Sequence, residues 1–170
     1  MQIRIRATGQ VLLEHEWIKW VATTYAKSIS AMTADIYDRF DSDAVFEGAQ
    51  ASGGTVYQYS QRDGIEQQSD GKWYTKYILG PVFTDTTVDG VTITAAAQEA
   101  AYKAQKDTEQ AKSVRTSRDA QLAECDWVAI RAFETGSAVA TEWATYRQAL
   151  RDTPDQAGFP WTITYPDKPE

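Results

Sequence analysis

The chain has 170 residues and one cysteine, Cys125, so it is long enough to build a real core and cannot form an intramolecular disulfide or a zinc site of several thiolates. Its net charge of −7, from 24 acidic and 17 basic residues, argues against nucleic acid as a partner, because phosphate binding needs clustered Lys and Arg. We find no apolar run that could span a bilayer and no signal peptide, so we expect no membrane partner, no export and a reducing compartment.

The N-terminal segment predicts a strand followed by helices. Isoleucine and arginine alternate in residues 2–7, which is the period-two pattern of a half-buried strand. After Gly9, large apolar side chains recur at spacings of three and four, at Trp17, Trp20, Val21, Tyr25 and Ile29. This spacing predicts an amphipathic helix. A second, short helix is predicted to begin after Thr33, whose hydroxyl could cap its first turn.

Residues 44–90 have the composition of strands and turns. Glycines interrupt runs that are rich in Val, Tyr and Ile. Two Asp-Gly pairs, at 63–64 and 70–71, separate segments of high strand propensity, and Asp-Gly is a strong signal for a tight hairpin turn. We therefore predict a three-stranded meander, with strands at 56–60, 65–68 and 72–79.

The region from residue 94 to residue 124 predicts one long helix, since it contains neither Gly nor Pro and is dominated by good helix formers. Its middle, residues 103–113, has almost no large apolar side chain. We therefore expect this part to bridge two halves of the molecule through solvent. The composition changes near residue 91, which predicts an N-terminal α+β domain at 1–91 and a second region at 92–170.

The C-terminal region predicts a helical hairpin and a tail. A Gly-Ser break at 136–137 precedes a helix expected at 138–152, and Pro154 ends it. Trp143, Tyr146 and Leu150 lie on one stripe of that helix. Three further prolines favour an extended tail after it. The predicted fold class is α+β, with a strand-rich N-terminal domain, a long connecting helix, and this hairpin.

The C-terminal half resembles the phage tail assembly chaperone family. The residues that carry the resemblance are Arg118-Asp119 with Leu122, Asp126-Trp127, the block WATYRQALRD at 143–152, Pro154, and GFPW at 158–161. The chain departs from the family pattern at 128–133, where members have a short polar linker with proline. It departs again at Tyr165-Pro166, where members end in Trp-Pro. The resemblance covers roughly residues 115–170 and rests on motifs of low degeneracy.

This resemblance implies a function in phage assembly. It implies a chaperone that binds a trimeric tail fibre protein and helps this client to fold or assemble in the host cytoplasm. Some relatives are expected to remain on the virion tail. Two other functions stay open. One is a permanent component of the fibre tip or baseplate. The other is a carbohydrate-binding module, suggested by Trp73, Tyr74 and Tyr77 on a predicted strand. Homo-oligomerisation also stays open.

Four candidates for client binding lie on or beside the predicted helices: Trp127, Trp143, Tyr146 and Arg147. Each also has a structural explanation. Packing against the long helix explains the helical stripe, and Trp127 could close a small core after a turn capped by Asp126. Arg147 could form a solvated ion pair with Asp119 or Asp152, worth at most about 1 kcal/mol.

Three further candidates lie in the tail: Phe159, Trp161 and Tyr165. No periodic element accounts for them, so they either fold back onto the helices or dock on a partner. Trp is a frequent binding hot spot, and prolines restrict the unbound segment. We therefore predict that Trp161 contributes to client binding and little to the stability of the fold.

No enzymatic or cofactor site is expected. His15 is the only histidine, and the neighbouring Glu14 and Glu16 point in different directions, so they cannot converge on one metal ion. Cys125 has no nearby histidine in sequence to activate it. Gly53-Gly54 is not followed by the lysine of a phosphate-binding loop. The sequence thus predicts a protein without cofactor or metal that acts by binding.

Overall fold

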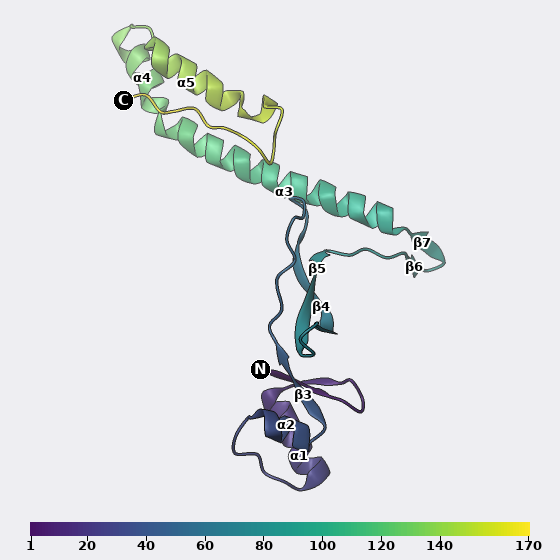
Figure 1. Cartoon of the computed structure of the whole chain (residues 1–170). Coiled ribbons are helices and arrows are strands. Elements are labelled where there is room, and N and C mark those ends of the chain that lie inside the picture. Colours follow the sequence, from purple (N-terminus) through teal and green to yellow (C-terminus); the bar gives the residue numbers. More distant parts are fainter. The chain divides into compact units, whose positions relative to one another are not determined.

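The computed structural model describes residues 1–170, which form two compact units, Met1–Val82 and Phe83–Glu170. The predicted α+β class is confirmed: a strand-rich sheet with two helices is followed by a long helix and further helices (Figure 1). The domain boundary predicted near residue 91 stays a prediction.

The first unit is built on a five-stranded sheet with the order β2-β1-β3-β5-β4. Its strands are β1 (Gln2–Ile5), β2 (Val11–Leu13), β3 (Ser42–Phe46), β4 (Tyr59–Gln67) and β5 (Trp73–Gly80). The central strand β3 pairs antiparallel with β1 and parallel with β5. The parallel pairing covers only two residue pairs, so the β4–β5 hairpin joins the sheet near one end of β5.

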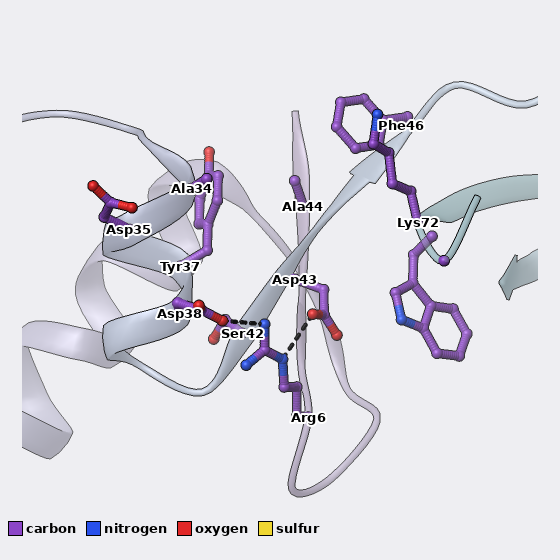
Figure 2. A pocket seen from close by; sticks show the side chains of 12 residues that line it. Arg6, Ala34, Asp35, Tyr37, Asp38, Ser42, Asp43, Ala44, Phe46 and Lys72 are labelled. Carbon is purple, nitrogen blue, oxygen red and sulfur yellow. Dashed lines mark hydrogen bonds and ion pairs between the residues drawn. The ribbon is translucent and has the colours of Figure 1, made fainter. Parts of the chain in front are cut away.

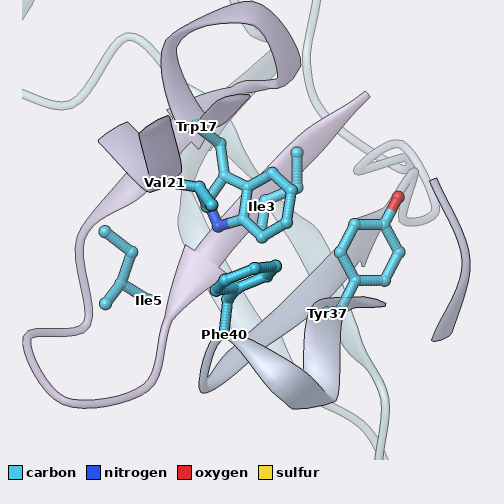
Figure 3. Packing of buried hydrophobic residues seen from close by; sticks show 6 residues of the cluster. All are labelled: Ile3, Ile5, Trp17, Val21, Tyr37 and Phe40. Carbon is cyan, nitrogen blue, oxygen red and sulfur yellow. The ribbon is translucent and has the colours of Figure 1, made fainter. Parts of the chain in front are cut away.

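The core of the first unit lies between this sheet and two helices, α1 (Glu14–Tyr25) and α2 (Ala34–Arg39). Ile3 and Ile5 are buried, as the alternating pattern predicts, and Trp17 packs edge-on against aromatic rings of α2 and the residue after it (Figure 3). The Trp17 indole N–H donates to Ser42 Oγ at 3.0 Å, and that hydroxyl donates to the Phe40 carbonyl at 2.9 Å. The buried polar groups are therefore paired, as burial requires.

Two details of the helices differ from the prediction. The Thr33 hydroxyl makes no capping hydrogen bond, and its carbonyl accepts the N–H groups of Ile36 and Tyr37, both at 3.1 Å. Helix α1 ends at Tyr25 because Ala26 is left-handed, with φ of 52°. Ile29 thus packs against the core from the loop that follows α1 and not from the helix.

The predicted three-stranded meander is wrong, since residues 59–67 form one continuous strand, β4. Asp63-Gly64 is a β-bulge in it, where the register with β5 shifts between Arg62 and Ile65. Gly64 has φ of 79°, and a bulge uses this left-handed conformation just as a turn does. Asp70-Gly71 does form the hairpin turn, and the N–H of Gly71 donates to the Gln68 carbonyl at 2.9 Å.

The second unit opens with a hairpin that the sequence analysis missed, β6 (Thr86–Val88) and β7 (Val91–Ile93). Asp89 and Gly90 connect the two strands with φ of 50° and 78°, values typical of a type I′ turn. The long helix α3 (Ala95–Glu124) then starts as predicted, because the Thr94 hydroxyl accepts the Ala97 N–H at 3.2 Å.

Three short elements follow α3: α4 (Asp126–Thr135), α5 (Thr141–Arg151) and the 3-10 turn η1 (Thr153–Asp155). Helix α4 was not predicted, whereas α5 falls within the predicted 138–152. Helix α5 packs back on α3 and forms the expected helical hairpin. The core of the hairpin contains Cys125, Val128, Tyr146 and Leu150.

Residues 103–113 of α3 are mostly exposed, as expected, but the C-terminal end of this stretch packs within its own unit. Ala111 and Val114 are buried, and the tail folds back along this part of the helix (Figure 1). The Tyr165 hydroxyl donates to the Val114 carbonyl at 3.1 Å. The helix thus packs against the tail of its own unit, although its own sequence shows no apolar stripe. None of the helices combines the length and hydropathy of a membrane span.

Candidate functional site

Arg147 connects the three helices of the hairpin at the point where α3 passes into α4. One guanidinium nitrogen donates to the Leu122 carbonyl at 3.2 Å and to Cys125 Sγ at 3.1 Å. The other donates to the Asp126 carboxylate at 2.9 Å. Only 12% of the Arg147 side chain is exposed, so α5 binds the last turn of α3 and the first residue of α4 through one planar group.

The electrostatics of this junction follow from those contacts. The hydrogen bond that Arg147 donates to the Asp126 carboxylate raises the pKa of the guanidinium above its ordinary value, and Cys125 acts in the same direction. Burial raises the pKa of the neighbouring Tyr146 hydroxyl. Both pKa shifts favour the charged arginine and the neutral tyrosine, so the guanidinium keeps its ion pair with Asp126.

Three aromatic side chains form a row across α4 and α5. Trp127 and Trp143 meet edge-on with ring centroids 5.7 Å apart, and Trp143 meets Tyr146 in the same way at 5.9 Å. Their burial falls along the row: Tyr146 is buried, Trp143 is half-buried, and Trp127 is 49% exposed. The row therefore extends from the core of the hairpin to its surface.

The tail contacts α3 through each of its aromatic residues. The Trp161 indole N–H donates to the Asp107 carboxylate at 2.6 Å, and the Arg115 guanidinium lies 5.1 Å from the Phe159 ring centroid. A tight turn orients both rings, with the N–H groups of Trp161 and Thr162 donating to the Gly158 carbonyl. A Cβ at Gly158 would lie 2.1 Å from the Thr162 carbonyl oxygen, so this close approach requires glycine.

In a comparison with known protein families, residues 111–170 match the family described as phage tail assembly chaperone protein. The C-terminal region is therefore similar to this family. The match supports a role in phage tail assembly and suggests that this role is not enzymatic. Comparisons with curated proteins and with solved structures find no match.

All seven predicted client-binding residues lie in the second unit, and one expectation about them is wrong. Arg147 pairs with Asp126, not with Asp119 or Asp152. Asp119 pairs instead with the adjacent Arg118. Of the two alternatives left open for the tail, the structure shows folding back, since Trp161 contacts α3. Whether any of the seven touches a client stays a prediction.

Two exposed residues of the C-terminal region, Ile130 and Phe133 on α4, were not predicted as site residues. They are 57% and 89% exposed. Together with Trp127 they form a series at spacings of three residues, which was the available signal. It was obscured because Val128, on the opposite side of the same helix, is buried in the hairpin core, so α4 shows no single apolar stripe.

A concave site also lies in the N-terminal unit, outside residues 111–170. It is a pocket of about 290 Å³ between α2, β3 and the β4–β5 turn (Figure 2). Arg6 lies in it and donates to Asp38 and Asp43, both at 2.7 Å. These ion pairs connect β1 with α2 and β3, which is a structural role. Nowhere do three or more His, Cys, Asp or Glu side chains form a group that could hold a metal ion.

Proposed function

We propose that this protein is a tail fibre assembly chaperone that binds a terminus of a fibre protein and assists its folding or trimerisation. The observation that carries the proposal is the family match over residues 111–170. The motif residues in this region support it, since they build a rigid helical hairpin and leave aromatic side chains at its surface.

A binding function of this kind meets a physical need of the client. Fibre chains form long intertwined β structures, and unpaired strand edges expose them to wrong pairing and aggregation. Pairing between distant parts of the sequence is also slow. A helper that covers a fibre terminus during the host stage of assembly would reduce both hazards without any chemical reaction.

The test is coexpression of the phage's tail fibre protein with this chain in a bacterial host. The full chain should raise the yield of soluble, SDS-resistant fibre trimers, whereas a chain truncated after residue 114 should not. Affinity capture of the full chain should also recover the fibre protein. Full trimer yield with the truncated chain would refute the assignment of function to this region.

Attachment to the virion is a separate question that the same phage can answer. We propose that the chaperone acts before the particle is complete, so purified particles should lack it. Finding it at fibre stoichiometry in purified particles would instead assign it as a permanent component of the tail.

A further inference from the structure

Helix α4 presents three large apolar side chains to solvent, Trp127, Ile130 and Phe133, which we call the α4 face. Their exposed fractions are 49%, 57% and 89%. Single exposed apolar residues are common on protein surfaces. Three in a row at one-turn spacing form the pattern with which a helix engages a partner. The hairpin core does not need this side of α4, because Val128 faces it.

The α4 face is held rigidly at both ends. At the start of the helix, Asp126 is bound by Arg147 and Trp127 packs against Trp143. At its end, Gly136 is left-handed with φ of 65°, and the Ser137 N–H donates to the Ala132 carbonyl at 3.0 Å. This closure is a Schellman-type cap. A partner would therefore lose little affinity to ordering of α4 itself.

A groove of about 370 Å³ continues from the α4 face, and Trp127 belongs to both. It lies between α4 and the start of α5, and its walls combine the apolar Val139 and Trp143 with the polar Arg131, Thr135 and Glu142. A space of this volume can accept a large apolar side chain. A partner on the α4 face thus has a neighbouring pocket for an anchoring residue, as interface hot spots require.

Two charged side chains without a partner in this chain lie beside the α4 face: Arg131, which lines the groove described above, and Glu134. Glu134 follows Trp127 by seven residues, so it lies on the same side of the helix. It forms no hydrogen bond or ion pair in this chain, and a carboxylate in the last turn is disfavoured by the helix dipole. A Lys or Arg of the partner beside Glu134 would pair with this carboxylate and offset its unfavourable position at the end of the helix.

A second copy of the chain fits this face poorly. Antiparallel pairing of two α4 helices about Ile130 would place Asp126 of one copy opposite Glu134 of the other. Like charges in an interface are destabilising. The chain as a whole is also acidic, with a net charge of −7. A basic partner is therefore better matched than a second acidic copy.

We propose that the α4 face is the docking surface for an amphipathic helical segment of the fibre protein, with apolar residues one turn apart and a Lys or Arg beside Glu134. This inference rests on the proposed function and adds the surface and the chemistry of the partner. The groove beside Trp127 receives the segment's largest apolar side chain.

The test uses the full chain and the tail fibre protein in a binding titration. Ile130→Ser with Phe133→Ser should weaken binding roughly thirtyfold, the usual effect of losing an interface hot spot. Glu134→Lys should weaken it several-fold and reverse its salt dependence. Val91→Ser is the matched control, because Val91 is 66% exposed on β7 and lies off the α4 face. All variants should melt at the temperature of the wild type, since these side chains are exposed.

The outcomes separate this inference from the proposed function. If the wild-type chain binds and assists the fibre, and the Ile130 and Phe133 double variant does so equally well, the docking surface is wrong and the proposed function stands. If the wild-type chain binds no fibre protein, both fail. If light scattering shows a dimer that the double variant converts to a monomer, the face joins two copies and the proposal is overturned.

Discussion

Replacing Arg147 should open the junction between the three C-terminal helices, and the structure sets the size of the effect. The ion pair with Asp126 contributes at most about 1 kcal/mol, because the carboxylate is 58% exposed and screened by solvent. The hydrogen bonds to the Leu122 carbonyl and Cys125 Sγ, together with the packed aliphatic stem, contribute roughly 1 to 2 kcal/mol more. We therefore expect Arg147→Ala to lower the free energy of unfolding by about 2 to 3 kcal/mol.

That loss is large enough to measure. In a unit of this size, 1 kcal/mol shifts the midpoint of thermal unfolding by roughly 4 to 8 °C, so Arg147→Ala should melt about 10 to 20 °C lower. Arg147→Lys keeps the charge but not the planar fork, so we expect about half the loss. Arg151→Ala is the matched control, since Arg151 lies one turn further along α5, is exposed and forms no ion pair.

Urea denaturation followed by circular dichroism at 222 nm gives the stability, and hydrogen exchange over residues 118–152 locates the change. Salt provides a further check. At about 0.5 M salt the ion pair is screened, yet most of the loss should persist because hydrogen bonds and packing dominate it. Equal urea midpoints for Arg147→Ala and Arg151→Ala would refute this account of the junction.

Three other changes test the tail and the absence of a cofactor. Gly158→Ala should cost about 1 to 3 kcal/mol, because the new Cβ meets the Thr162 carbonyl, and limited proteolysis should then cleave the tail faster. Trp161→Phe should cost about 1 to 2 kcal/mol by removing the indole donor to Asp107; no additional loss in the double variant with Asp107→Asn would confirm that the two act as a pair. A chelator should leave the melting temperature unchanged, and a stoichiometric metal in elemental analysis would contradict this.

Elements defined by local signals could be predicted from the sequence. The alternation of Ile3 and Ile5 with arginine predicted β1, because successive side chains of a strand point to opposite faces and only one face of this strand is buried. The absence of Gly and Pro after Thr94 predicted α3, and the cap at Thr94 is seen only in the structure. The spacing of Tyr146 and Leu150 gave the buried stripe of α5. In each case a few neighbouring residues determine the structure.

Elements defined by distant contacts could not be predicted. Asp63-Gly64 fits a turn and a bulge equally well, and pairing with β5 along the whole of β4 decides between them. The contact between Trp161 and Asp107 spans 54 residues, and nothing in the tail's own sequence identifies the helix it packs on. The same limit applies to Arg147, whose partner depends on how α5 folds back on α3.

Most residues of the family motifs lie inside the hairpin, although the motif residue Trp127 reaches the α4 face, where the residues that depart from the motifs are exposed. Arg147, Asp126 and Leu150 from the motifs bind or pack within the hairpin. Ile130 and Phe133 lie in the stretch where the chain departs from the family pattern, and both are exposed. A chaperone needs a stable support and a surface matched to its own client, and only the surface must differ between relatives. We therefore expect exchange of residues 128–133 between chaperones to change which fibre is assisted, and exchange at Arg147 to change stability alone.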